Sequence, residues 1–114
     1  MKHSAKVNNK IYYGELLALY GNLLTKKQFE YMQSYFQEDY SLAEIAENYN
    51  VTRVAIHNQL QNACKKLDAF ENELHLLYLN QKFLPNIEAA LINEKTADIT
   101  KEINKLRTVM KWSE

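Results

Sequence analysis

The chain has few of the residues that interrupt helices. It contains two glycines and one proline among 114 residues. It also lacks alternating apolar and polar runs bounded by turn residues, which are the usual signature of half-buried strands. These absences exclude a sheet-rich protein. We therefore expect an all-α fold with long, uninterrupted helices.

Disulfide chemistry and membrane spans are excluded in the same way. The single cysteine, Cys64, cannot form an internal disulfide, and its spacing after Leu60 is typical of a buried or seam position. The sequence has no 18-residue apolar run, and its first residues lack the apolar core of a signal peptide. We expect a protein of the reducing cytoplasm that is neither secreted by this route nor inserted in a membrane.

A charge excess of either sign is also lacking. The chain balances 14 lysines and arginines against 14 aspartates and glutamates, whereas nucleic-acid-binding domains usually carry a basic excess. The basic side chains that can face one duplex are Lys26, Lys27, Arg53, Lys65 and Lys66. One chain therefore offers fewer contacts than the roughly 6 to 10 phosphates that a DNA-binding protein typically neutralises. Duplex binding is expected chiefly from a dimer.

What the sequence does contain is the spacing of a helix-turn-helix unit at residues 41–60. Ser41 and Glu44 form a capping box at the start of a first helix, and Asn50 suits the left-handed backbone just past its end. The apolar positions between them recur at helical spacing. They are Leu42, Ile45, Ala46 and Tyr49.

A second helix follows after a tight turn. Val51 is expected to act as an apolar plug, Thr52 can cap the second helix, and Ala46 is small enough to let the two helices cross closely. The expected buried positions of the second helix are Ala55, Ile56 and Leu60. In nucleic-acid binders such a helix lies in the major groove, and its N-terminal residues reach the base edges.

The segments before this unit divide into a terminus and two helices. Residues 1–10 are polar and aperiodic, so we expect them to be disordered. A first helix begins at Ile11, and a capping box of Thr25 and Gln28 begins a second that reaches about Phe36. The apolar positions of the first helix are Tyr12, Leu16, Leu19, Tyr20, Leu23 and Leu24. Residues 11–67 form the helix-turn-helix domain in this interpretation, and residues 68–114 form a helical extension.

No helix breaker occurs between Thr52 and Pro85, which allows one helix of roughly 30 residues, or about 45 Å. Two sets of residues repeat every seven positions along it and form a heptad seam. The expected dimer interface is Leu60, Leu67, Phe70, Leu74 and Leu77. After Pro85 we expect a short helix to Ile92 and a last one from Thr96, forming either an antiparallel hairpin or a dimerisation arm.

Six residues of the second helix of the unit remain outward after the core is assigned. Arginine and asparagine are suited to paired hydrogen bonds with guanine and adenine, and the alternative is an ordinary solvated face. The candidate nucleic-acid-binding residues are Arg53, Val54, His57, Asn58, Gln61 and Lys65.

Catalytic and metal-binding patterns are missing. The histidines His3, His57 and His75 are scattered, and neither a phosphate-cradling glycine loop nor paired metal ligands exist. We therefore expect no enzyme activity, no metal and no cofactor.

The segment 23–74 carries a resemblance to known proteins. Its distinctive runs are LT (24–25), KQ (27–28), YM (31–32), DYSL (39–42) and EIAE (44–47). With these runs it resembles the YlxM family of small bacterial helix-turn-helix proteins and, more distantly, region 4 of sigma-70-type factors. In that family the gene lies beside genes for signal recognition particle components. The resemblance thus implies a cytoplasmic factor of that pathway.

This chain departs from the family on the second helix of the unit. It keeps Arg53 and Ala55 but lacks two positive charges that the family usually carries there. Our leading hypothesis is a noncatalytic, dimeric accessory or regulatory factor of the signal recognition particle pathway that binds DNA or the particle's RNA. The alternative is a protein-protein interaction module that docks signal recognition particle proteins without binding nucleic acid.

Overall fold

The computed structural model describes residues 9–111, in which every regular element is helical. The predicted all-α fold class is confirmed. The predicted disordered N-terminus lies outside the described residues except for Asn9 and Lys10, and Lys10 already begins a helix. The chain divides into an N-terminal unit that ends at Phe70 and a C-terminal unit that begins at Glu71, where the sequence suggested a boundary between residues 67 and 68.

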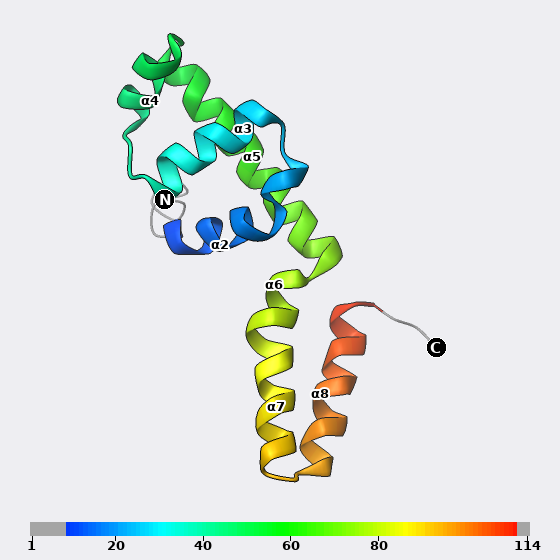
Figure 1. Ribbon diagram of the computed structural model, residues 1–114. Helices are drawn as coiled ribbons and strands as arrows, with labels where there is room; N and C mark the ends of the chain where they lie inside the picture. Colours follow the sequence, from blue (N-terminus) through cyan, green and yellow to red (C-terminus); the bar gives the residue numbers. More distant parts are fainter. Residues whose placement is uncertain (1–8, 112–114) are drawn as a thin grey trace. The chain divides into compact units, whose positions relative to one another are not determined.

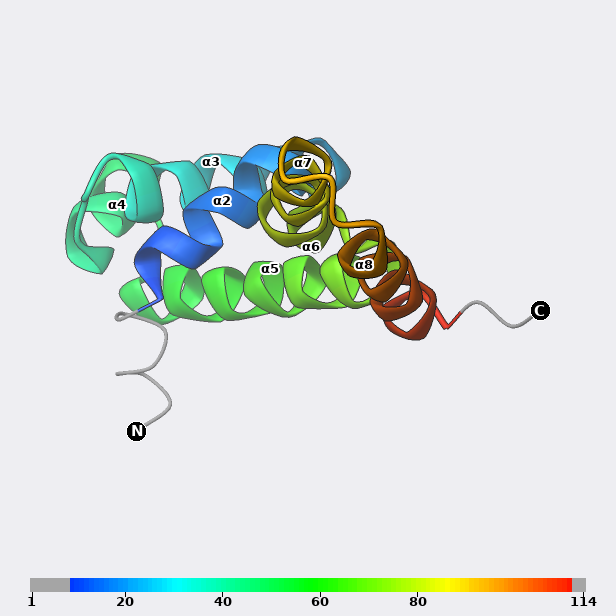
Figure 2. The ribbon, with the colours of Figure 1, turned by 90° about the horizontal axis from the view of Figure 1, so that it is seen from below.

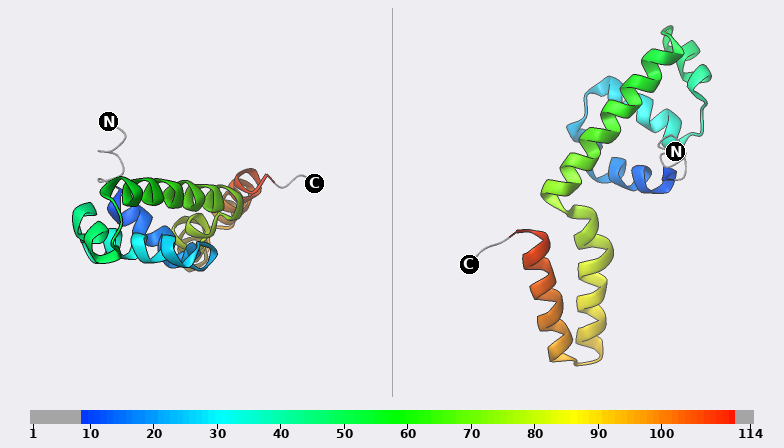
Figure 3. Two further views of the ribbon diagram at one scale, coloured as in Figure 1. Left: turned by 90° about the horizontal axis from the view of Figure 1, so that it is seen from above. Right: turned by 180° about the vertical axis from the view of Figure 1, so that it is seen from behind.

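Helices α2 to α5 make up the N-terminal unit (Figure 1). In chain order its elements are α2 (Lys10–Tyr20), a 3-10 turn (Gly21–Leu23), α3 (Lys26–Met32), a π-helical turn (Gln33–Gln37), α4 (Leu42–Tyr49) and α5 (Arg53–Leu74, whose last turn belongs to the C-terminal unit). Helices α2, α3 and α4 lie on one side of α5, as Figure 2 and the left view of Figure 3 show. The core of this unit therefore lies along one stripe of α5.

The capping box predicted for α3 is present. The Gln28 N–H donates to Thr25 Oγ1 at 3.1 Å, and the Thr25 N–H donates to Gln28 Oε1 at 3.3 Å. Lys66 Nζ on α5 donates to the same Gln28 Oε1 at 3.1 Å. One buried amide therefore caps α3 and also connects it to α5.

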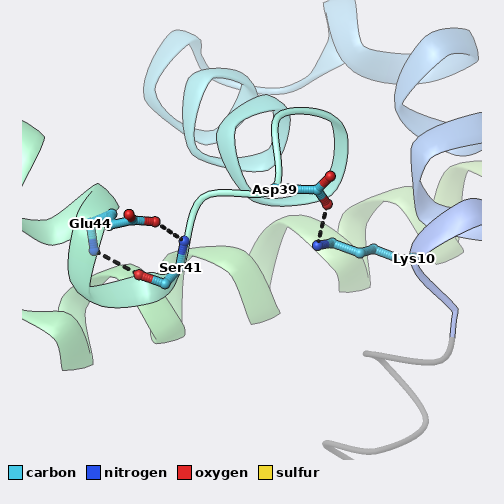
Figure 4. A network of polar contacts seen from close by, with 4 residues as sticks. All are labelled: Lys10, Asp39, Ser41 and Glu44. Atoms are coloured by element: carbon cyan, nitrogen blue, oxygen red, sulfur yellow. Dashed lines mark hydrogen bonds and ion pairs between the residues drawn. The ribbon is translucent and has the colours of Figure 1, made fainter.

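The capping box of α4 is present as well, next to a second polar link (Figure 4). The Ser41 N–H donates to Glu44 Oε1 at 2.8 Å, and Ser41 Oγ accepts from the Glu44 N–H at 3.1 Å. Just before it, Asp39 adopts a left-handed backbone with φ of 61° and forms an ion pair with Lys10 Nζ at 2.8 Å. The link between α3 and α4 is thus held to the start of α2.

The turn of the helix-turn-helix unit follows the sequence prediction with one exception. Asn50 is left-handed, with φ of 58°, and the Val51 N–H donates to the Ala46 carbonyl at 3.0 Å. Thr52 Oγ1 accepts from the Ala55 N–H at 3.0 Å, which caps α5. The plug prediction for Val51 was wrong, because its side chain is 40% exposed. The hydrogen bond at its backbone, rather than its side chain, holds the turn.

The core of the N-terminal unit draws side chains from α2, α3, α4 and α5. Its buried hydrophobic residues are Tyr13, Leu16, Leu17, Tyr20, Leu24, Tyr31, Met32, Phe36, Ile45, Ala46, Ile56, Leu60, Ala63, Cys64 and Leu67. Leu19 and Leu23, predicted on the apolar face of α2, are exposed. Leu19 lies at the edge of the buried stripe, and Leu23 falls in the 3-10 turn, where the rotation per residue differs from that of an α-helix.

The long helix ends earlier than predicted. The expected helix of about 30 residues is broken at His75, which adopts a left-handed backbone with φ of 58°. The Glu71 carboxylate accepts the N–H groups of Leu77 at 3.0 Å and Tyr78 at 3.1 Å. Glu71, in the last turn of α5, thus caps the helix that follows the break. Its carboxylate replaces the backbone acceptors that the first N–H groups of that helix lack.

The C-terminal unit is an antiparallel helical hairpin, one of the two arrangements predicted (Figure 1). Its first arm consists of α6 (Leu76–Tyr78), a π-helical turn (Leu79–Phe83) and α7 (Leu84–Ile92), and its second arm is α8 (Thr96–Val109). Pro85 lies in the first turn of α7 as expected, but the chain is already helical before it. The hairpin turn contains Glu94, whose φ is 52°.

The residues of the predicted dimer seam are distributed over different surroundings. Leu60 and Leu67 lie on the buried stripe of α5, Leu77 is also buried, and Phe70 packs its ring 5.9 Å from that of Tyr20. Leu74 is exposed. A second copy cannot reach Leu60 and Leu67 while the core is intact. The dimer stays a prediction, but it requires a different surface.

Candidate nucleic-acid interface

The candidate residues lie along the side of α5 that faces away from the core. Val54, Asn58, Gln61 and Lys65 are spaced i, i+4, i+7 and i+11, which places them on one helical stripe. Val54 is 67% exposed, Asn58 and Lys65 are exposed, and Gln61 is partly buried. Most of this stripe is therefore accessible to a partner.

Arg53 and His57 lie beside this stripe, on the flank that faces the start of α4. Arg53 is exposed and His57 is partly buried. Together with Val54 and Leu42 they line a shallow hollow of about 240 Å³. Leu42 was predicted as a core residue and was missed as a site residue. Its place in the first turn of α4, next to the cap, was the available signal.

Of the five basic residues expected to contact phosphate, two interact with other side chains of this chain. Lys66 donates to Gln28, and Lys27 Nζ lies 4.9 Å from the centroid of the Tyr49 ring. Arg53, Lys26 and Lys65 are exposed. Arg53 and Lys65 are separated by twelve residues of helix, or about 18 Å. The face therefore offers one cation at each end, with the apolar Val54 and the amides of Asn58 and Gln61 between them.

Two acidic residues of α4 add negative charge next to this surface. Glu44 is exposed, but its carboxylate is held by the Ser41 N–H in the capping box. Glu47 is also exposed. Bound phosphates would be repelled by either carboxylate within about 8 to 10 Å at ordinary salt. A ligand must therefore approach from α5 rather than from α4.

Tyr49 supports the junction between α4 and α3. Its ring meets that of Tyr31 edge-on at 4.9 Å and carries the Lys27 ammonium over its face. Burial raises the pKa of the Tyr49 phenol, and the negative charge of Glu30 raises it further. The phenol therefore stays neutral at physiological pH and adds no charge to the site.

Within residues 9–111 no group of three or more His, Cys, Asp and Glu side chains is placed to hold a metal ion. None of the helices described there combines the length and the apolar character that crossing a bilayer requires.

Comparison with known proteins gives a family match over residues 7–109. The family, UPF0122, carries the description "Putative helix-turn-helix protein, YlxM / p13 like". The UPF0122 protein of Lactococcus lactis subsp. cremoris is 44% identical over 61 residues, which are 54% of this chain and 55% of that protein. The UPF0122 protein of Pediococcus pentosaceus is 36% identical over 96 residues, which are 71% of this chain and 83% of that protein.

A third relative, the UPF0122 protein of Acetivibrio thermocellus, is 40% identical over 84 residues, 73% of this chain and 69% of that protein. The match to the Lactococcus protein spans little more than half of its length, whereas the Pediococcus match spans most of the relative. The resemblance to the YlxM family is confirmed. This chain belongs to the UPF0122 family of YlxM- and p13-like helix-turn-helix proteins.

Proposed function

We propose that this protein is a noncatalytic, cytoplasmic accessory factor that binds nucleic acid through the outward face of α5. The observation that carries the proposal is the exposure of the first turns of α5 behind a turn of defined geometry. Asn50 and Thr52 fix where α5 begins, and Arg53, Val54 and Asn58 are exposed directly after it. In helix-turn-helix proteins these first turns contact the base edges.

Each side chain of this face has a suitable partner on a duplex. Arg53 can donate two hydrogen bonds to guanine, Asn58 can pair with adenine, and Val54 offers a methyl contact to thymine. Lys65, three turns further along, suits a backbone phosphate. The face thus combines base contacts near the start of α5 with a positioning contact further along it.

The link to protein targeting comes from the family rather than from any residue of the site. In the YlxM family, which the sequence resembles, the gene lies beside those for signal recognition particle components. We therefore extend the proposal to an accessory or regulatory role in that pathway, with DNA or the particle's RNA as the nucleic acid. The two ligands differ in groove geometry, because A-form RNA has a deep, narrow major groove that side chains cannot read.

A direct binding measurement tests the proposal. Fluorescence anisotropy would use a duplex DNA of about 30 base pairs, long enough for two half-sites one turn apart, the signal recognition particle RNA, and an unrelated RNA of equal length. We expect binding to one specific ligand whose affinity falls as salt rises, by a logarithmic slope of about 0.9 per phosphate contact on B-DNA. No binding to any of them at low salt would contradict the proposal.

Arg53→Ala should weaken binding to the specific ligand by about fivefold or more, because a bidentate contact to guanine is worth about 1–3 kcal/mol. Its thermal stability should hardly change, since Arg53 is exposed. Lys66→Ala is the charge-matched control: it removes the same charge from α5, but on the flank that contacts Gln28. Equal effects of both variants would show that net charge, rather than the outward face, governs binding.

The hollow beside α4 favours a second candidate function. Leu42 and Val54 give it apolar walls next to Arg53 and His57, and such a surface fits an apolar side chain of a partner protein. A protein-docking module would bind a protein component of the targeting machinery and no nucleic acid. Val54→Asp would then abolish binding to that protein, whereas in the first function it would reduce nucleic-acid affinity.

A further inference from the structure

The hairpin of the C-terminal unit has two sides of opposite character. One side is a polar groove of about 320 Å³ between α7 and α8. It is lined by Asn86, Ala89, Ala90, Asn93, Lys95, Asp98, Lys101, Glu102 and Lys105. Within it Glu102 accepts from Asn86 Nδ2 at 3.3 Å and forms an ion pair with Lys105 at 3.4 Å. Polar contacts within the chain thus connect the two helices on this side.

The other side of the hairpin is apolar. On α7, Leu84, Ile87 and Leu91 are spaced i, i+3 and i+7, which turns them away from the groove-lining residues of the same helix. On α8 and its end, the corresponding positions are Ile99, Ile103 and Met110. Leu84 is 50%, Leu91 58% and Ile103 40% exposed. Two helices thus present one continuous apolar face.

Two helices alone cannot cover this face. Of the hydrophobic side chains of the C-terminal unit in the described part of the chain, Leu77 and Ala90 are the buried ones. A helix pair buries one stripe of each helix against the other, and a second pair is needed to cover the adjoining stripes, as in a four-helix bundle. The hairpin therefore leaves exposed the apolar stripes that a second helix pair covers in a bundle.

We propose that a second copy of this chain covers the apolar face, so that two hairpins form an antiparallel four-helix bundle. A closed two-fold dimer needs the same patch on both copies, and this face supplies it. α8 has 14 residues, so the face is about 21 Å long and about 20 Å wide. Treated as a flat patch, the face then buries about 800 Å² summed over both copies, and the uneven surface of the side chains adds to this area. The sum approaches the roughly 1,000 Å² that a specific interface needs.

Two-fold symmetry also determines which helices meet across the face. When the two hairpins point in opposite directions, the axis crosses the face at right angles to the helices. Each helix then packs antiparallel against its own copy, α7 on the partner's α7 and α8 on the partner's α8. Leu84 and Leu91 are thus covered by the partner's α7, and Ile103 is covered by the partner's α8.

The dimer interface in this proposal replaces the heptad seam of the sequence prediction and does not depend on the proposed function. Analytical ultracentrifugation of the full chain tests it. We expect a dimer at high micromolar concentration, and Leu84→Glu or Ile103→Glu should weaken self-association by at least about tenfold, as loss of a central contact does. Ala89→Glu is the matched control, because it adds the same charge on the polar groove side. Circular dichroism verifies that each variant is folded.

A monomeric wild type at high micromolar concentration, or a dimer that Leu84→Glu leaves intact, would overturn the proposal.

Discussion

The two units of this chain obtain their stability in different ways. In the N-terminal unit, side chains from α2, α3, α4 and α5 enclose one core, which includes fully buried residues such as Leu16, Met32 and Leu67. In the C-terminal unit, two helices bury little hydrophobic surface, and a polar groove and an exposed apolar face flank their contact. The N-terminal unit therefore has a closed core of its own, whereas the hairpin leaves apolar side chains exposed.

The exposed surfaces of the two units also differ in chemical character, and each character suits a different kind of partner. The exposed residues of the N-terminal unit on α5 are mostly polar, which suits a transient, charge-dependent ligand. The exposed face of the C-terminal unit is apolar, which suits a stable protein contact. The two proposals therefore place ligand binding and assembly on separate surfaces, which mutations can address separately.

Replacing one leucine of each unit, the buried Leu67 or the exposed Leu84, gives the largest expected contrast. Leu67→Ala should lower the free energy of unfolding by about 2–5 kcal/mol, because it leaves a cavity in a closed core. Leu84→Ala should cost less than about 0.5 kcal/mol at low protein concentration, where the chain is a monomer. Urea denaturation at two protein concentrations measures both. If the Leu67→Ala loss grew with concentration, Leu67 would be an interface residue after all.

Removing the cap at the junction of α5 and α6 should have an intermediate effect. Glu71→Ala leaves the N–H groups of Leu77 and Tyr78 without their acceptor, which should cost about 0.5–2 kcal/mol. Hydrogen exchange at these two amides should accelerate. Glu73→Ala, an exposed neighbour on α5, is the control and should leave their exchange unchanged. Equal acceleration in both variants would mean that the charge of α5, not the cap, protects them.

The smallest effect is expected at a polar contact of the N-terminal unit. Tyr13 Oη donates to Asp68 Oδ2 at 3.0 Å, and burial, followed by the Asp68 contact, raises the pKa of the Tyr13 phenol. Because the folded pKa lies above the unfolded one, this stabilisation is complete below about pH 10 and is lost as the pH rises above it.

Tyr13→Phe should therefore cost about 0.5–1.5 kcal/mol at neutral pH. It should also lose less stability than the wild type when the pH is raised further. Thermal unfolding at neutral and alkaline pH measures both effects. Parallel pH profiles for the two proteins would contradict the assignment.

The parts of the fold that depend on local signals were predictable. The capping boxes at Thr25 and Ser41 and the left-handed Asn50 are set by residues within a few positions of one another. The break at His75 was not predictable, because no glycine, proline or asparagine marks it. It depends on the Glu71 carboxylate reaching amides six and seven residues later. The polar or apolar character of its neighbours gives no sign of that contact.

The candidate site was predictable to a similar extent. The helical spacing identified which side of α5 faces outward, since Ile56 and Leu60 face inward. It did not indicate that Leu42 borders the site, because that depends on how α4 crosses α5. The seam prediction did not anticipate the burial of Leu60 and Leu67 in the chain's own core, for a related reason. A heptad pattern shows which residues share a stripe, but not whether the chain's own helices or another copy cover that stripe.

Helix α5 begins three residues after one left-handed residue, Asn50, and ends just before another, His75. Its length is therefore fixed at both ends. One inserted residue would turn every later side chain by about 100° and move Leu67 off the stripe that contains Ile56. Relatives that differ in length are thus expected to carry their insertions in the turn at residues 93–95 or beyond α8, where an added residue displaces no core side chain.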